Sequence, residues 1–116
     1  MRILLLAFMV LNLVVGCVAH HPGPELIDNG VRFTLSAPLA KNVAIAGSFN
    51  NWNPRRDLLS GPDHHGVWSI TLPIPSGRYE YLFVINDEKW LLDPFAPSTG
   101  DGMEGENSVL IVEDAE

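Results

Sequence analysis

The sequence predicts an all-β fold, an immunoglobulin-like antiparallel β-sandwich of about seven short strands. The first observation is the apolar pattern after residue 29, which has the period of two that is typical of half-buried strands. The second is turn chemistry, because Pro, Gly, Asn and Asp separate the apolar runs at a spacing of about 8–12 residues. The third is that 116 residues with a single cysteine allow one domain and no internal disulfide.

The predicted strands follow one another in six alternating runs: residues 31–35, 43–46, 68–72, 79–85, 89–92 and 109–112. In the longest run the aromatic residues form one stripe, and Glu80, Leu82 and Val84 lie on the opposite face. Trp68 is in phase with the apolar residues of its own run, so we expect it in the core. Prolines, glycines and asparagines between the runs exclude long helices.

Residues 1–16 predict a secretory signal, because Arg2 is followed by an apolar stretch too short for a membrane span of about 20 residues. Residues 14–17, Val-Val-Gly-Cys, resemble a bacterial lipobox. That resemblance implies that Cys17 is acylated and becomes the new N-terminus, so that several acyl chains anchor the protein stably. The alternative is an ordinary cleaved signal that ends near Cys17.

The rest of the chain then divides into a tether, a domain and a tail. Residues 17–29 carry the lipidated cysteine and a tether rich in Pro and Gly, residues 30–112 form the sandwich, and residues 113–116 are an acidic tail. Val18 after the cysteine favours the outer membrane of the bacterial cell envelope, on either its periplasmic or its surface side. This organisation predicts an exported, lipid-anchored protein.

Net charge and motifs exclude several functions. The chain has 7 Lys and Arg against 14 Asp and Glu, a net charge of −7, and no basic cluster that would neutralise nucleic-acid phosphates. Sequence motifs of hydrolases, phosphate-binding loops and zinc proteases are absent from the sequence. We therefore expect neither an enzyme nor a cofactor. Three polar groupings are too weak to predict catalysis or a metal site: His20 with His21, Asp63 with His64 and His65, and Asp101 with Glu104 and Glu106.

Two tryptophans occur in polar surroundings where burial is not expected. Trp52 lies among three asparagines and a proline, and Trp90 follows a polar turn at residues 86–89. A flat indole packs well on the C–H face of a pyranose ring and loses little side-chain entropy in doing so. Amides such as those of Asn50, Asn51 and Asn107 both donate to and accept from sugar hydroxyls. These residues predict a binding site for a neutral glycan.

Four motifs in this order carry a family resemblance: Gly-Ser-Phe-Asn-Asn-Trp at 47–52, Gly-Arg-Tyr-Glu-Tyr-Leu-Phe at 77–83, Trp90 with Asp-Pro at 93–94, and Glu-Asn-Ser-Val at 106–109. Together they resemble the family 48 carbohydrate-binding module. This module is the glycogen-binding domain of the AMP-activated protein kinase beta subunit and the N-terminal early-set domain of isoamylases and branching enzymes. The resemblance covers about residues 30–112 and implies binding of α-1,4-glucans such as glycogen, starch or maltodextrin.

The resemblance also implies which residues contact the sugar. The two platform tryptophans of the family match Trp52 and Trp90, and the asparagine that binds sugar hydroxyls matches Asn107. A leucine that inserts beside the oligosaccharide falls at Met103. The binding-face lysine falls at Leu82, which removes a charged donor, and Lys89 in the longer turn before Trp90 is the candidate replacement.

Two function classes remain open from the sequence. The first is a non-catalytic, lipid-anchored module that binds an α-glucan. The second is a protein-interaction module of the cell envelope, in which the tryptophan face contacts a partner protein and binds no sugar. The apolar Leu82 and the predicted export both favour this alternative.

Overall fold

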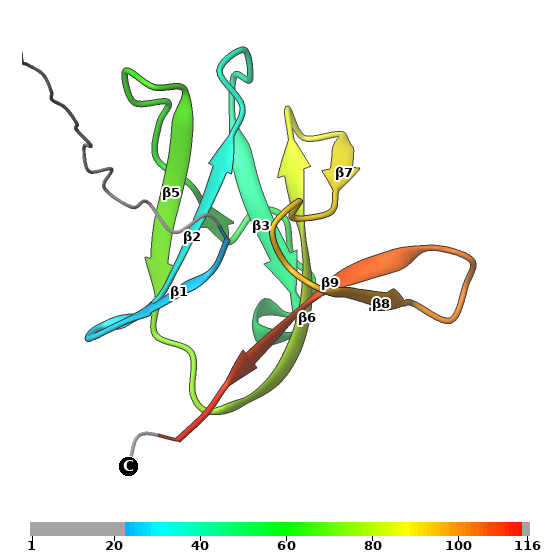
Figure 1. The fold of residues 1–116 in the computed structure, drawn as a ribbon. Coiled ribbons are helices and arrows are strands. Elements are labelled where there is room, and N and C mark those ends of the chain that lie inside the picture. The colour runs from blue at the N-terminus through cyan, green and yellow to red at the C-terminus, as the bar shows by residue number, and fades with distance from the viewer. Residues whose placement is uncertain (1–22, 115–116) are drawn as a thin grey trace, which may run out of the picture.

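The computed structural model describes residues 23–114 and confirms the predicted all-β sandwich of two antiparallel sheets. The described residues form nine strands: β1 (Glu25–Ile27), β2 (Gly30–Ser36), β3 (Val43–Gly47), β4 (Asp57–Leu58), β5 (Val67–Leu72), β6 (Gly77–Ile85), β7 (Lys89–Leu91), β8 (Ser98–Gly100) and β9 (Glu106–Val112). The smaller sheet has the order β1-β2-β5, and the larger has the order β4-β3-β6-β9-β8, with β7 paired to β6 (Figure 1). A short 3₁₀ helix, η1 (Ser48–Asn50), follows β3.

The core lies between the two sheets and is rich in aromatic residues. Phe33 of β2 contacts Tyr81 of β6 edge to face, with ring centroids 5.1 Å apart, and Phe49 of η1 lies 5.8 Å from Phe33. Trp68 of β5 is buried as predicted, and its indole N–H donates to the carbonyl of Ala37 at 2.9 Å. Because a buried indole N–H needs an acceptor, this bond allows a tryptophan to occupy the core.

The larger sheet also has an apolar outer face, directed away from the smaller sheet. Because side chains alternate along a strand, burying Tyr81 and Phe83 of β6 turns Leu82 and Val84 outward. On the neighbouring strand β3, the small Ala44 and Ala46 pair in register with Val84 and Leu82. Trp52 packs over Ala44, Ala46 and Val84, and this outer face carries the predicted site.

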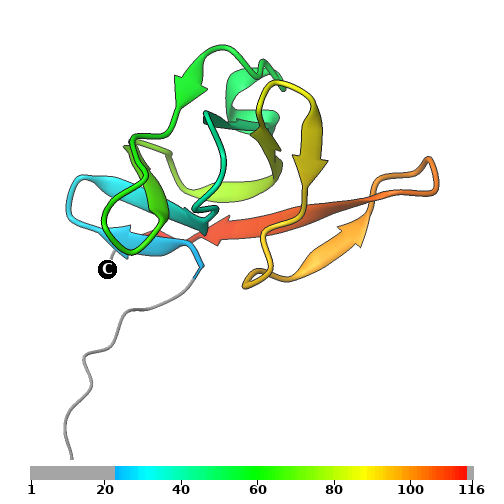
Figure 2. The ribbon, with the colours of Figure 1, turned by 90° about the horizontal axis from the view of Figure 1, so that it is seen from above.

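Strands β8 and β9 form a hairpin that projects beyond the sandwich (Figures 1 and 2). In the register of this hairpin Thr99 pairs with Asn107, and Gly100 pairs with Glu106. The connecting loop is closed by Asp101, whose Oδ1 accepts hydrogen bonds from the backbone N–H groups of Met103 at 2.7 Å and Gly105 at 3.0 Å. These two bonds hold the pKa of the Asp101 carboxyl below its ordinary value.

Three strands were missed by the sequence prediction. Strand β1 lies inside the segment predicted as a tether, where the adjacent Asp28 and Asn29 turn the chain back so that Ile27 pairs with Gly30. Strands β4 and β8 contain two and three residues, too few for a periodic pattern to appear. Strand β1 thus begins at Glu25, inside the segment that was expected to be a tether.

The predicted signal, lipobox and first part of the tether lie outside the described residues, and so do Cys17, His20 and His21. Within residues 23–114, no helix is long and apolar enough to cross a membrane.

Candidate functional site

One row of paired residues crosses four strands on the outer face of the larger sheet. Leu58 of β4 pairs with Ala44 of β3, Ala44 pairs with Val84 of β6, and Val84 pairs with Trp90 of β7. Residues paired in this way project from the same face, with Cβ atoms of direct neighbours about 4.5–5.5 Å apart. Trp52 packs against the cluster formed by Ala44, Ala46 and Val84, so both predicted platform tryptophans adjoin the same part of the outer face.

Trp52 owes its position to an unusual turn. Asn51 and Trp52 both adopt the left-handed helical conformation, with φ of 59° and 58°. A bulky residue with positive φ is rare, and each such residue costs on the order of 1–3 kcal/mol. The turn is closed by the Trp52 N–H, which donates to the carbonyl of Gly47 at 2.8 Å. This strained geometry carries the indole back over β3 and β6.

The turn is held in place by Asn50, which is only 2% exposed. Its Oδ1 accepts from the backbone N–H of Gly47 at 2.9 Å, and its Nδ2 donates to the carbonyl of Ile45 at 3.0 Å and to Oδ2 of Asp57 at 2.8 Å. The expectation that Asn50 contacts sugar hydroxyls is therefore wrong, because its amide is buried and bonded on both sides. Asn51, by contrast, is exposed beside Trp52.

Gly47 permits the turn to lie close against β6. A Cβ added at this position would lie 2.6 Å from the carbonyl oxygen of Glu80 and 2.8 Å from the Cβ of Tyr81. Both distances are far below normal contact, so any side chain would push the turn away from the sheet. The Gly-Ser-Phe-Asn-Asn-Trp motif is thus a structural unit whose first residue allows close approach and whose last residue carries the indole.

Trp90 lies at the edge of the sheet and is 45% exposed, as the sequence predicted. It follows a hairpin turn in which Asn86 and Asp87 both have positive φ. Oδ1 of Asn86 accepts from the N–H groups of Lys41 and Asn42, which ties this turn to the start of β3. Lys89 pairs with Ile85, so its side chain leaves the strand on the side opposite to Trp90. The structure therefore does not bring Lys89 onto the outer face.

Leu82 and Asn107 lie on the outer face beside the tryptophan row. Leu82 pairs with Ala46 and is partly buried. Since Tyr81 pairs with Ser108, the antiparallel register brings Leu82 and Asn107 to neighbouring positions on this face. Trp52, Trp90, Leu82 and Asn107 thus share one surface, whereas they are spread over 56 positions in the sequence.

A charged group that the sequence analysis did not select also lies on this surface. Glu80 accepts a hydrogen bond from Nδ2 of Asn107 at 3.0 Å through Oε1, and one from Arg78 at 2.8 Å through Oε2. These hydrogen bonds, Asn107 first and Arg78 second, hold the pKa of Glu80 below its ordinary value. The signal for Glu80 was present in the sequence, because the period of two places it on the same face as Leu82.

Met103 is 82% exposed at the end of the β8–β9 hairpin. The loop around it is shaped by the Asp101 carboxylate and by positive φ angles at Gly102 and Glu104. An unbranched, apolar side chain held out in this way is available for a ligand that extends past Asn107 toward the hairpin.

The network that ends strand β7 fixes the edge of the sheet. Asp93 is 3% exposed, and its Oδ2 accepts from the Tyr81 hydroxyl at 2.6 Å, while its own N–H donates to Oγ of Ser108 at 2.8 Å. Burial, followed by the hydrogen bond to Asp93, raises the pKa of Tyr81. The network connects β6, β9 and the segment after Trp90, so Asp93 has a structural role.

Two of the three groupings considered for catalysis or metal binding lie within residues 23–114, and Asp63, Asp101 and Glu106 make local hydrogen bonds there. Oδ1 of Asp63 accepts from the N–H groups of His65 and Val67, bonds that lower the pKa of this carboxyl and close a turn. Glu106 accepts from the hydroxyl of Ser98, away from Asp101. Within residues 23–114, no three His, Cys, Asp or Glu side chains are arranged to hold a metal ion.

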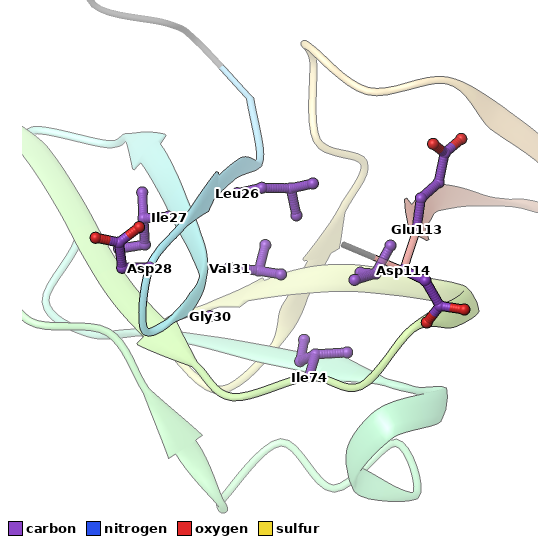
Figure 3. A pocket seen from close by; sticks show the side chains of 9 residues that line it. Leu26, Ile27, Asp28, Gly30, Val31, Ile74, Glu113 and Asp114 are labelled. Carbon is purple, nitrogen blue, oxygen red and sulfur yellow. The ribbon is translucent and has the colours of Figure 1, made fainter. Parts of the chain in front are cut away.

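An open groove lies apart from the tryptophans, at the end of the molecule where the C-terminal residues approach the β1–β2 hairpin (Figure 3). Leu26, Val31 and Ile74 face one another across it, and Glu113 and Asp114 lie at its rim. None of its lining residues is aromatic. The candidate site is therefore the open outer face and not this groove.

Comparison with known families and proteins agrees with the sequence resemblance. The family model for carbohydrate-binding module 48, the isoamylase N-terminal domain, matches residues 19–96. The match includes Trp52 and Trp90 and ends before the hairpin that carries Met103 and Asn107.

Individual relatives are similar over about two thirds of the chain. Protein PTST, chloroplastic, from Arabidopsis thaliana is 38% identical over 78 residues, which are 65% of this chain and 27% of that protein. The 1,4-alpha-glucan branching enzyme GlgB of Bacillus cytotoxicus is 38% identical over 72 residues, which are 59% of this chain and 11% of the enzyme. GlgB 1 of Clostridium perfringens is 41% identical over 80 residues, 65% of this chain and 12% of the enzyme. The chain thus spans about a quarter of the first relative and about a tenth of the branching enzymes.

Proposed function

This chain belongs to the carbohydrate-binding module 48 family, and from that membership and the outer-face geometry we propose that it binds an α-1,4-glucan without catalysing a reaction on it. The observation that carries the proposal is the position of the two tryptophans on one outer face. Trp52 packs against the cluster of Ala44, Ala46 and Val84, and Trp90 pairs with Val84. A polymer such as glycogen, starch or maltodextrin is neutral, and the binding groups here are indoles and an amide. Two of the relatives are named 1,4-alpha-glucan branching enzymes, and this name supports the same class of ligand.

In this proposal the two tryptophans stack on successive glucose units. Since Trp52 packs against the cluster of Ala44, Ala46 and Val84, and Trp90 pairs with Val84, a ligand bound by both indoles passes over the row that crosses β4, β3, β6 and β7. Asn107 binds hydroxyls at the adjoining edge, and Leu82 and Met103 provide apolar contacts. Stacking of a flat ring on an aromatic side chain is worth about 1–3 kcal/mol, by analogy with bases.

Two such stacking contacts on an open face give a single site with weak affinity for the glucan. After the loss of translational and rotational freedom, we expect a dissociation constant on the order of micromolar to millimolar. Many copies of the protein on one membrane would bind the same polymer together, and this avidity would compensate for the weak affinity of each site. The weak single-site affinity is therefore compatible with retention on glycogen or starch granules.

The experiment is a titration with maltoheptaose, followed by tryptophan fluorescence and amide NMR shifts. It can use a chain that starts at Val18, because the buried core residues run from Val31 to Leu110. We expect saturable shifts around Trp52 and Trp90, and Trp52→Ala should weaken binding at least tenfold. Phe95→Ala is the matched control, since Phe95 is an exposed aromatic residue whose backbone lies against Gly23.

Either of two outcomes contradicts the proposal. The first is an absence of shifts at millimolar maltoheptaose. The second is equal binding by Trp52→Ala and Phe95→Ala. Retention of an envelope protein in the absence of any sugar binding would instead favour the protein-interaction function.

We also propose that the protein is a bacterial lipoprotein anchored through Cys17 in the cell envelope, in the outer membrane. The lipobox-like residues Val-Val-Gly-Cys at 14–17 support this proposal. The full chain should incorporate labelled fatty acid and sediment with the outer membrane, and Cys17→Ser should release it from the membrane fraction and abolish labelling. If Cys17→Ser still sediments with membranes, the anchor is elsewhere.

A further inference from the structure

Glu80 occupies the edge of the proposed sugar site, and its partners restrict how the site can bind. It lies on the outer face of β6, two residues before Leu82. Its side chain is 26% exposed, so it borders solvent without projecting into it. Arg78, on the same face, occupies Oε2 of the carboxylate, and this leaves Oε1 for Asn107.

The hydrogen bond from Asn107 to Glu80 determines which end of the Asn107 amide faces outward. A carboxylate only accepts hydrogen bonds, so the amide must direct its nitrogen toward Glu80. The amide group is planar, and its oxygen then points away from Glu80. Within residues 23–114 this oxygen accepts no hydrogen bond from a protein group.

We propose that Glu80 is a positioning residue that presents the Asn107 carbonyl oxygen to the glucan as a hydrogen-bond acceptor. This inference rests on the proposed function and deepens it. Asn107 then selects a sugar hydroxyl that donates, and the charged Arg78–Glu80 pair fixes the amide in advance of binding. Because the amide is already oriented, less side-chain freedom is lost when the sugar binds.

As long as position 107 is an asparagine, position 80 requires a carboxylate and not merely a polar group. An amide at this position has both a donor and an acceptor end, so it can meet either end of the Asn107 amide. Glu80→Gln would therefore leave Asn107 in two orientations, one of which directs its nitrogen at the ligand. It would also remove the charge that holds Arg78 in place.

The test is an exchange of functional groups between the two positions, read as maltoheptaose affinity. Glu80→Gln should weaken binding about threefold to tenfold, the loss of one hydrogen bond of ordinary strength. Asn107→Asp should weaken it at least tenfold, because two carboxylates then face each other with no donor between them. The double variant Glu80→Gln with Asn107→Asp restores an amide-to-carboxylate bond in the reverse sense and still directs an oxygen outward. We expect it to bind within about threefold of the original protein.

Glu106→Gln is the matched control, because it removes the same charge one residue from Asn107 on the opposite face of β9. It should bind like the original protein, and melting temperatures should show that all variants are folded. Recovery in the double variant is a result that a purely structural role would not produce. If the double variant binds no better than the weaker single variant, or Glu80→Gln binds normally, the inference is overturned while the proposed function stands. If the original protein does not bind maltoheptaose, the proposed function fails and this inference fails with it.

Discussion

Replacing Asn50 by alanine should be among the most damaging single substitutions outside the aromatic core. The side chain is buried and makes three hydrogen bonds, to the N–H of Gly47, the carbonyl of Ile45 and the carboxylate of Asp57. Alanine leaves all three partners without this side chain in a region that water reaches poorly. It also removes the group that holds Trp52 in its left-handed conformation.

The magnitude follows from the three bonds. Two are neutral and are worth about 0.5–1.5 kcal/mol each, and the one to Asp57 is charge-assisted and worth about 1.5–3 kcal/mol. We therefore expect a loss of about 3–5 kcal/mol in the free energy of unfolding. A domain of this size has about 5–15 kcal/mol in total, and each kcal/mol lowers the melting temperature by about 4–8 °C. The melting temperature of Asn50→Ala should fall by more than about 12 °C.

The assay is urea unfolding followed by tryptophan fluorescence, with Asn53→Ala as the matched control. Asn53 belongs to the same turn but is exposed, and its single bond to the N–H of Arg55 should be worth less than about 1 kcal/mol. Asp57→Asn keeps an acceptor without its charge and should fall between the two. If Asn50→Ala and Asn53→Ala lose similar stability, the assignment of Asn50 as the clamp of the turn is wrong.

Three further predictions concern the face and its support. Trp90→Ala should change the unfolding free energy by less than about 1 kcal/mol, because the indole is 45% exposed at a sheet edge, while maltoheptaose binding falls at least tenfold; a large loss of stability would contradict this separation. Leu82→Lys supplies the donor that the family resemblance places there and should raise maltoheptaose affinity about twofold to tenfold in the same titration; weaker binding would show that the apolar side chain is the better contact. The pKa of the Tyr81 hydroxyl is raised in the folded protein, so the unfolded chain loses the hydroxyl proton at lower pH, and the free energy of unfolding should decline above about pH 10. Urea unfolding from pH 8 to 11 should show a smaller decline in Tyr81→Phe. An equal decline of the unfolding free energy with pH in both proteins would refute the assignment.

The sequence was sufficient to predict the sandwich and one side of the site. Period-two runs placed six strands, and the polar surroundings of Trp90 correctly indicated an exposed indole. Trp52 is instead partly buried, because its indole packs against Ala44, Ala46 and Val84. Trp68 was separated from them by its phase alone, and its burial is confirmed. These features are local in the sequence, so a pattern of a few residues suffices to reveal them.

The remaining features depend on contacts between distant segments. Asn50 and Asn51 are identical in type and adjacent, and only the fold decides that one is buried and the other exposed. The opposite direction of Lys89 depends on its pairing with Ile85 across a turn of three residues. The contact between Glu80 and Asn107 joins positions 27 residues apart, and periodicity can place each on a face but cannot bring them together.

The two tryptophans are supported in different ways, and this difference has a consequence for binding. Trp52 is placed by a strained turn that Asn50 must hold, so its position is coupled to the stability of the fold. Trp90 lies on a short edge strand, and its exposed indole does not depend on a buried side chain in the way that Trp52 depends on Asn50. A ligand that contacts both indoles should therefore raise the free energy of unfolding through its contact with Trp90 as well as with Trp52. The size of this increase depends on the ratio of the ligand concentration to the dissociation constant. Maltoheptaose at about ten times the dissociation constant of the original protein should raise the free energy of unfolding of that protein by about 1.4 kcal/mol. The same concentration should raise that of Trp90→Ala, which binds at least tenfold more weakly, by about 0.4 kcal/mol or less, although Trp52 and its turn are intact in that variant.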